Sequence, residues 1–150
     1  MKKGFTLIEL LVVMVVIGIL VAVALPKYKT AMERGRGLEG MANAAAVSDA
    51  LNAYYIRNYN SYGTDVNNLK QYANKVNQET TNKFFSHPSD WISLSSGTAT
   101  VKMTRNLSSK SYTIVFVNTG GETTARYCTG YQRYCNALGA VNSYSSGWSF

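Results

Sequence analysis

Residue types that carry catalytic and metal chemistry are scarce in this chain. Its 150 residues include only two cysteines and one histidine. So few nitrogen and sulfur donors cannot assemble a four-ligand zinc site, and the spacing from Cys128 to Cys135 does not match the CxxC redox motif. The sequence also lacks a phosphate-binding loop and paired glycosidase carboxylates. Ser86, His87 and Asp90 are near neighbours at an exposed proline turn, which is not how a hydrolase triad is built. We therefore predict that the chain is not an enzyme and that it needs no cofactor or metal.

Charge is almost absent from the N-terminal segment. Between Phe5 and Leu25 the only ionisable side chain is Glu9. At about 1.5 Å of rise per residue this run forms a helix of roughly 32 Å, which is long enough to cross a bilayer. A helix that is apolar on every face is suited to lipid, because it satisfies its own backbone hydrogen bonds there. The sequence therefore predicts a membrane anchor over residues 5–25.

A secretory signal peptide is the alternative explanation for this segment. Such peptides have an apolar core of about 7–15 residues, followed by a small-x-small cleavage site. The run here is longer, and the residues after it, Pro26-Lys27-Tyr28-Lys29, offer no such site. Small and basic residues precede the run instead. Cleavage is therefore expected at Gly4, which leaves the apolar helix in the product.

The segment KKGFTLIELLVVMVVIGILVAVALPKY resembles the N-terminus of type IV prepilins and of the related pseudopilins of type II secretion. The match covers about the first 30 residues and includes the basic residues, Gly4, Phe5, Glu9 and Pro26. The resemblance implies that a prepilin peptidase cuts between Gly4 and Phe5 and methylates the new amino group of Phe5. Residues 1–4 would then be a removed leader, and residues 5–25 the transmembrane and assembly part of a long helix. Loss of the leader would lower the formal charge from +7 to +5.

Glu9 requires an explanation in an apolar helix. A carboxylate at the bilayer centre costs about 2.5–3.5 kcal/mol on insertion scales, so it is retained where it finds a partner or reaches the interface. The amine exposed on Phe5 would lie four residues away on the same helix face. The resemblance implies that the amine of one subunit pairs with Glu9 of its neighbour during filament assembly. Snorkelling of Glu9 to the lipid headgroups is the alternative.

A second helical pattern follows Pro26. Apolar residues recur there at three- and four-residue spacing, at Met41, Ala44, Val47, Leu51 and Tyr54. Pro26 removes one backbone hydrogen bond and clashes with the preceding turn, so we expect a kink at this position. We predict one long helix from about Thr6 to about Arg57, whose second half is amphipathic. The glycines between residues 35 and 40 predict a locally loose helix.

The C-terminal half has the alternating pattern of β-strands. Four runs rich in β-branched and aromatic residues are separated by tight turns, at residues 91–94, 98–104, 112–118 and 122–128. They predict an antiparallel meander with one solvated face, whose apolar face packs on the amphipathic half of the long helix. A short helix from about residue 66 lies between these parts. We therefore predict an α+β fold of the pilin type, with residues 26–150 forming a single head that includes a sheet of about four strands.

The two cysteines predict a disulfide between Cys128 and Cys135. In an oxidising compartment their even number favours this bond, and closing so short a loop stabilises by about 2–3 kcal/mol. The resemblance agrees, because type IV pilins commonly hold their C-terminal region in this way, whereas major pseudopilins generally use calcium there. No acidic residue follows Glu122, so the carboxylates of such a calcium site are missing. This difference favours a pilin over a pseudopilin.

These features predict a structural subunit of a type IV pilus, with adhesion, twitching motility or DNA uptake as its roles. The precursor would reside in the bacterial inner membrane, and the pilus machinery would polymerise it into an extracellular homo-oligomeric filament. The alternatives are a pseudopilin of type II secretion, a minor pilin that binds DNA and, in a different class, a membrane-anchored enzyme or sensor. Basic and aromatic residues can hold nucleic acid, and the candidates are Lys70, Lys75 and Lys83 ahead of the sheet and Lys102, Arg105, Lys110, Arg126, Tyr131, Arg133 and Tyr134 with it. A solvated surface is the favoured explanation of these cations, so DNA is not the favoured partner.

Overall fold

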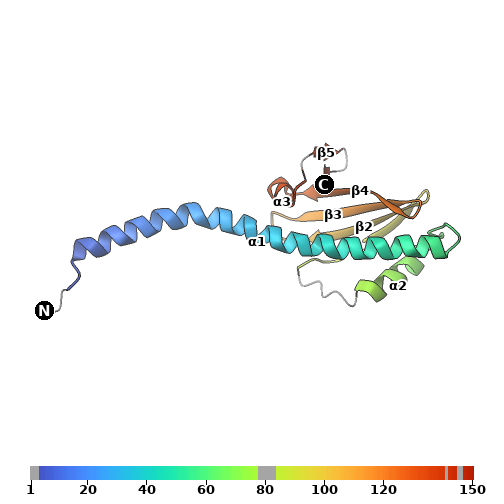
Figure 1. The fold of residues 1–150 in the computed structure, drawn as a ribbon, viewed down its shortest axis with the longest axis horizontal. Coiled ribbons are helices and arrows are strands. Elements are labelled where there is room, and N and C mark those ends of the chain that lie inside the picture. The colour runs from blue at the N-terminus through green and yellow to red at the C-terminus, as the bar shows by residue number, and fades with distance from the viewer. Residues whose placement is uncertain (1–3, 78–83, 141, 145–146) are drawn as a thin grey trace.

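One helix runs through most of the length of the molecule. The computed structural model describes residues 4–77, 84–140, 142–144 and 147–150. Helix α1 (Leu7–Arg57) continues through Pro26 without interruption. Its N-terminal part extends alone, and its C-terminal part packs into the head (Figure 1). The predicted single helix is confirmed, with its start one residue later than expected.

The head contains a six-stranded antiparallel sheet of order β1-β2-β3-β4-β6-β5. Its strands are β1 (Ile92–Ser95), β2 (Thr98–Arg105), β3 (Tyr112–Thr119), β4 (Glu122–Gly130), β5 (Asn142–Tyr144) and β6 (Gly147–Ser149). The first four are the predicted meander, with bounds that agree to within two residues. The β5–β6 hairpin at the sheet edge was not predicted, because its three-residue strands are too short for an alternating pattern.

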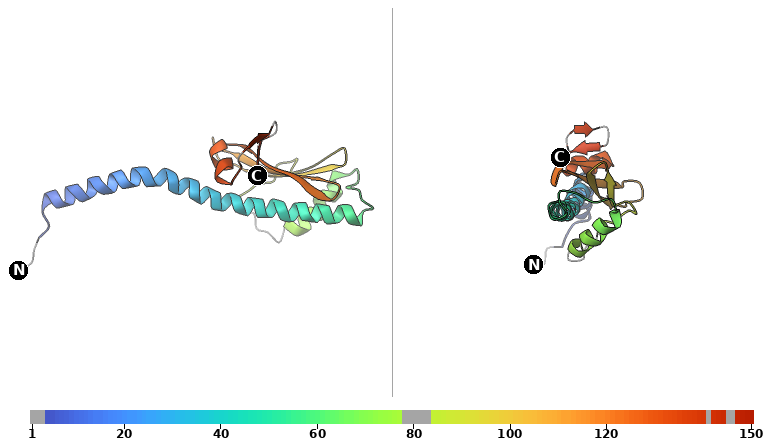
Figure 2. Two further views of the ribbon diagram at one scale, coloured as in Figure 1. Left: turned by 45° about the horizontal axis from the view of Figure 1, so that its top comes forward. Right: turned by 90° about the vertical axis from the view of Figure 1, so that its right-hand side faces the viewer.

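Two helices complete the head, namely α2 (Val66–Asn77) and α3 (Gln132–Ala137). Figures 1 and 2 show the C-terminal part of α1 between the sheet on one side and α2 on the other. The apolar stripe of α1 is buried against the sheet, with Ala44, Val47 and Leu51 at most 1% exposed. The opposing sheet residues are also buried, at Ala99, Val101, Met103, Ile114 and Phe116. The predicted packing of helix on sheet is confirmed.

Two glycines of α1 mark close approaches between elements. A Cβ atom on Gly37 would overlap the side chain of Leu138, and one on Gly40 would lie 2.5 Å from the ring of Phe85. The prediction of a loose helix is therefore wrong at these positions, where the missing side chain makes room for tight packing. At Gly35 nothing lies within 4 Å of such a Cβ atom.

A buried polar cluster joins α1 to the end of the sheet farthest from the bare helix. The side chain of Asn118 is fully buried, and its Nδ2 donates to the carbonyl of Ala99 at 3.2 Å. Its Oδ1 accepts from the hydroxyls of Thr123, at 2.9 Å, and Ser48. The pairing of β3 with β4 shifts register between Val117 and Asn118. The far part of α1 is thus tied to β3 by directional contacts as well as by apolar packing.

Candidate assembly and anchor site

The part of α1 ahead of the head buries none of its apolar window against the rest of the described chain. Its large apolar side chains from Leu7 to Leu25 are 45–87% exposed. Among the described residues, α1 is also the one helix that is long and apolar enough, by length and composition, to cross a membrane. A contiguous exposed apolar surface marks contact with lipid or with another protein. This half of α1 is therefore expected to be covered by lipid or by another protein.

Thr6 and Glu9 close the N-terminus of the bare helix with a capping box. The backbone N–H of Thr6 donates to Glu9 Oε2 at 2.8 Å, and the Thr6 hydroxyl donates to the same oxygen at 2.7 Å. The backbone N–H of Glu9 donates in turn to Thr6 Oγ1 at 3.4 Å. The carboxylate that looked isolated in the sequence therefore has local donors in the single chain.

The expected cleavage position lies just outside the helix. Gly4, Phe5 and Thr6 precede the first helical residue, and the side chain of Phe5 is 85% exposed. A non-helical, exposed peptide is the kind of backbone that a peptidase can bind. Cleavage between Gly4 and Phe5, methylation of Phe5 and the pairing of Glu9 with a neighbouring subunit remain predictions.

Pro26 lies inside α1, at the junction between the bare helix and the head. It has no N–H to offer the preceding turn. Its own carbonyl accepts from the Thr30 hydroxyl at 3.1 Å and from Arg133 Nη2 at 3.4 Å. The second contact joins α1 to α3 across the junction. Figure 1 shows that α1 is curved ahead of the head, whereas a kink centred on Pro26 itself remains a prediction.

A buried ionic cluster holds α1 against the sheet about two turns beyond this junction. Glu33 is 5% exposed, and its Oε1 accepts from Arg105 Nε at 2.8 Å and from the Tyr112 hydroxyl at 3.2 Å. Its Oε2 faces Arg36 Nη1 at 3.4 Å. Burial alone would raise the pKa of Glu33, but the hydrogen bond and charge of Arg105, with the Tyr112 and Arg36 hydrogen bonds, outweigh burial and hold it below its usual range. Burial and the charge of Glu33 together raise the pKa of Tyr112, so its hydroxyl remains a donor.

Glu33 is the residue of this site that the sequence analysis missed. It stands in a polar stretch, MERGRGLEG, that resembles a solvated helix face. Its helical register, however, places it on the buried stripe. Positions 33, 37, 40, 44, 47 and 51 follow one another at three- and four-residue spacing, and all are buried. Extending the apolar stripe backwards through the glycines would have identified Glu33 as a buried carboxylate in need of a partner.

The structure contains the predicted disulfide between Cys128 on β4 and Cys135 on α3. Both cysteines are fully buried, and their Cα atoms are 5.6 Å apart. The bond holds α3 against the sheet. Because Leu138 follows α3 and packs on Gly37, the disulfide also positions the segment that covers this part of α1.

Several of the cations considered for nucleic-acid binding are engaged within the head, and Lys83 lies outside the described residues. Arg105 is engaged by Glu33, and Lys102 forms an ion pair with Asp90. Arg126 lies over the ring of Phe116, with its guanidinium carbon 5.3 Å from the ring centroid. This arrangement gives no support to a nucleic-acid groove.

The residues considered for hydrolase chemistry have other neighbours. The ring of His87 lies against Trp91, with centroids 4.5 Å apart, and the Ser86 hydroxyl donates to the carbonyl of Thr104 at 3.3 Å. Burial lowers the pKa of His87. Among the described residues, no group of three or more histidine, cysteine, aspartate or glutamate side chains is arranged to hold a metal ion.

Comparison with known proteins gives a family-model match at the N-terminus and matches to pilins over about a third of the chain. Residues 1–25 match the family model of the prokaryotic N-terminal methylation motif. A type IV major pilin protein, PilE1 of Neisseria gonorrhoeae, is 43% identical over 56 residues, which is 37% of this chain and 34% of the pilin. The fimbrial protein EcpC of Eikenella corrodens is 44% identical over 54 residues, or 36% of this chain and 35% of that protein. The type IV narrow pilus major component PilA5 of Thermus thermophilus is 50% identical over 48 residues, which is 32% of this chain and 41% of that protein.

These matches are partial, and the one to the methylation motif lies at residues 1–25. The chain spans about a third of the length of the pilins that it matches. No solved structure matches the chain significantly. The resemblance to type IV pilins is confirmed over this segment. The three relatives described are pilins and pilus components, which supports the prediction that the chain is not an enzyme.

Proposed function

We propose that this chain, which matches the N-terminal methylation motif and is similar to type IV major pilins over about a third of its length, is a structural subunit of a type IV pilus. One observation carries the proposal. The apolar half of α1 is bare, with side chains 45–87% exposed, while the other half is fixed in a folded head. A surface of this kind is stable only when lipid or copies of the same helix cover it.

Assembly is then an exchange of environments for the bare helix. In the precursor, lipid covers residues 5–25 and the head stands outside the inner membrane. In the filament, equivalent helices of neighbouring subunits cover one another. Contacts between different faces of identical subunits, repeated with rotation and rise, generate an open helical fibre.

Glu9 is proposed to fix the axial position of each incoming subunit. In the single chain its Oε2 is occupied by the Thr6 backbone N–H and hydroxyl. The amine on a cleaved Phe5 of a neighbour would offer a full positive charge in place of these neutral donors. An ion pair between the amine and Glu9 is stronger in an apolar surrounding than in water, and stronger than the hydrogen bonds from the neutral Thr6 donors. It would therefore select one axial position of the subunit among apolar contacts that are otherwise similar.

Mass spectrometry of filaments sheared from the cell surface tests the proposal directly. The expected product begins at Phe5, carries an added methyl group on its amine, contains the Cys128–Cys135 disulfide and is the main protein of the fibre. An intact N-terminus from Met1 to Gly4, or the absence of the chain from surface fibres, would contradict the proposal. The first of these outcomes would favour a membrane-anchored enzyme or sensor.

The same filament preparation distinguishes a main pilus subunit from a pseudopilin and from a minor pilin. A pseudopilin of type II secretion is expected in short periplasmic assemblies and not in long surface fibres. A minor pilin is expected at low abundance relative to another subunit, and a DNA-binding one would retain DNA in a salt-dependent way. Long fibres composed mainly of this chain would exclude both alternatives.

A further inference from the structure

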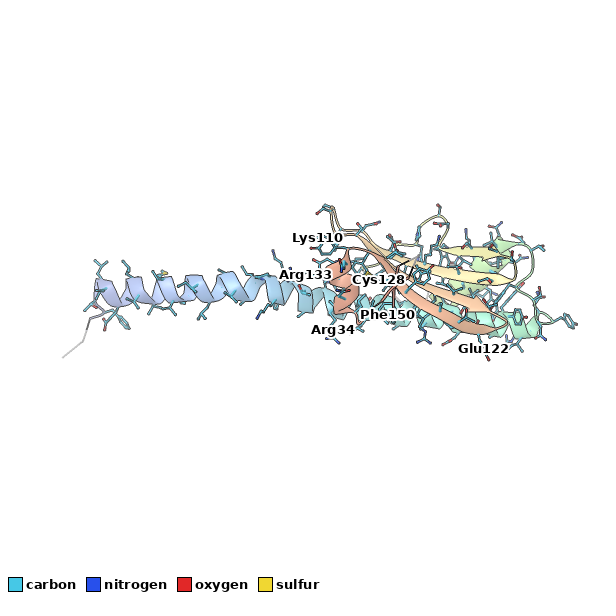
Figure 3. The ribbon with its side chains drawn as sticks, turned by 90° about the horizontal axis from the view of Figure 1, so that it is seen from above. Arg34, Lys110, Glu122, Cys128, Arg133 and Phe150 are labelled. Carbon is cyan, nitrogen blue, oxygen red and sulfur yellow. A yellow bond between two sulfur atoms is a disulfide. The ribbon has the colours of Figure 1, made fainter. Side chains whose placement is uncertain are left out.

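The end of the head that faces the bare helix carries an excess of positive charge. Lys27, Lys29, Arg34, Lys110 and Arg133 are all exposed there. Figure 3 shows Arg34, Lys110 and Arg133 at this end, and Glu122 at the opposite end of the head. The acidic residue nearest to these cations along α1, Glu33, points inward and is 5% exposed. The charge of the head is therefore distributed unevenly along the direction of α1.

Three of the cations meet at a cleft of about 250 Å³. Its walls come from α1 (Leu25, Pro26, Lys29, Thr30), from the β2–β3 connection (Lys110) and from the start of α3 with the residue before it (Tyr131, Arg133, Tyr134). None of these lining residues is acidic. Arg133 is held in place by the carbonyl of Pro26 at 3.4 Å, and the Lys110 ammonium lies 5.7 Å from the ring centroid of Tyr131. Internal contacts thus orient two of the three charges.

The depth of this cleft relative to the anchor is set by helix geometry. The apolar run ends at Leu25, so that residue lies at the edge of the hydrocarbon when residues 5–25 span it. Lys29 follows four residues later, which is about 6 Å farther along the helix. The headgroup layer on each side of a bilayer is about 5–8 Å thick. The cleft therefore lies at the level of the lipid phosphates, and Tyr131 and Tyr134 lie where interfacial aromatic residues are enriched.

We propose that this cleft, lined by Lys29, Lys110 and Arg133, binds the headgroup of an anionic phospholipid while the subunit is stored in the membrane. Lysine and arginine donate charge-assisted hydrogen bonds to phosphate oxygens, and Leu25 with Pro26 contacts the start of the acyl chains. The bound lipid fixes the head against the membrane surface through two points, the anchor helix and the cleft. The inference rests on the proposed membrane anchoring of residues 5–25.

Lipid retention by the full-length chain tests the proposal. The protein is reconstituted in vesicles of phosphatidylethanolamine and phosphatidylglycerol at three to one, released into mild detergent and weighed by native mass spectrometry. The wild type is expected to retain phosphatidylglycerol in preference to phosphatidylethanolamine. The double variant Lys29→Gln/Lys110→Gln is expected to retain about thirtyfold less phosphatidylglycerol, because each cation near the surface strengthens the attraction to anionic lipid about fivefold. Arg57→Gln/Lys75→Gln removes two exposed cations elsewhere on the head and is expected to match the wild type.

Further measurements identify the chemical class of ligand that the cleft binds and control for misfolding of the double variant. Retention by the wild type is expected to fall as sodium chloride rises, since exposed charges are screened over about 10 Å at 0.1 M salt. Inorganic phosphate at equal ionic strength is expected to compete no better than chloride, because it lacks the acyl chains. If the double variant loses its near-ultraviolet circular dichroism, Lys29→Gln alone replaces it, since Lys29 is exposed on a helix.

Four outcomes would overturn the proposal. Equal phosphatidylglycerol retention by the wild type and the lysine variants is one, and salt-independent retention is another. Displacement of the lipid by inorganic phosphate would assign the cleft to a free anion. Unchanged retention combined with poor filament incorporation would assign the cations to carboxylates of a neighbouring subunit. In each case a chain that resists alkaline extraction from the membrane is still anchored, so loss of the cleft proposal leaves the proposed function to its own test on sheared filaments.

Discussion

Replacing Glu33 with glutamine is expected to loosen the contact between α1 and the sheet at the end of the head nearest the bare helix. The residue is 5% exposed, and its carboxylate accepts hydrogen bonds from Arg105, Tyr112 and Arg36. Removing one partner of a buried ion pair costs about 3–5 kcal/mol, because the other charge remains desolvated. The glutamine oxygen can still accept from Tyr112, and Arg36 is partly exposed, with 29% of its side chain accessible. The lower end of that range, about 3 kcal/mol, is therefore expected.

The measurement is thermal unfolding of the full-length chain in detergent, followed by the near-ultraviolet circular dichroism of its aromatic residues. For a head of this size, about 3 kcal/mol corresponds to a Tm lower by roughly 10 °C. Asp49→Asn is the matched control, since it removes one exposed carboxylate from the same helix and is expected to change stability by less than about 0.5 kcal/mol. Equal Tm values for the two variants would refute the assignment of Glu33 as a structural clamp.

The stabilising effect of Glu33 also has a defined pH dependence. Its pKa is lowered in the folded head, whereas in the unfolded chain it is near the ordinary value of about 4.3. A carboxyl with a lowered folded pKa stabilises fully above the unfolded pKa, and this contribution is lost as pH falls through the folded one. The Tm difference between wild type and Glu33→Gln is therefore expected in full at pH 7 and narrows below about pH 4. A difference that does not change down to pH 2 would contradict the ionic origin of the effect.

Four further substitutions test other parts of the molecule. Cys128→Ser is expected to lower the unfolding free energy by about 2–3 kcal/mol and to increase protease sensitivity, and unchanged protease resistance would contradict this. Gly40→Ala is expected to lower the Tm because its Cβ would lie 2.5 Å from the Phe85 ring, whereas Gly35→Ala is expected to raise it slightly through helix propensity. Glu9→Ala is expected to insert and to be cleaved normally but to incorporate poorly into filaments beside wild type, and equal incorporation in a mixed-subunit assay would rule out the pairing role.

The periodic parts of the fold could be predicted from the sequence alone. Apolar residues spaced three to four apart predict the long helix and its buried stripe at residues 41–54. Apolar residues at every second position predict the four main strands, and the apolar face of these strands packs on that stripe. The β5–β6 hairpin could not be predicted, because two three-residue strands carry no periodic signal. The tight packing at Gly37 was also missed, since a glycine in a helix predicts local weakness unless the opposing residue is known, and here it is Leu138.

The candidate site divides in the same way. Gly4, Phe5, Glu9 and the apolar run belong to a linear motif, so their identification needs no tertiary structure. The Thr6–Glu9 capping box is also local and readable as residues three positions apart. The Glu33–Arg105 pair joins residues 72 positions apart, and composition cannot show which cation reaches which carboxylate. The basic cleft has the same long-range origin, because α1, the β2–β3 connection and α3 contribute one cation each.

The two polar clusters of the head hold the C-terminal half of α1 on the sheet at both of its ends. The bare half of α1 buries none of its apolar window within the described chain. The other half is fixed by the Glu33 cluster near the junction and by the Asn118 cluster at its far end, with apolar packing between them. Directional contacts at both ends resist sliding or rotation of α1 against the sheet, which apolar packing alone resists less well. The head is thereby held in one orientation relative to the anchor, so equivalent surfaces would meet at every step if the helices bundle.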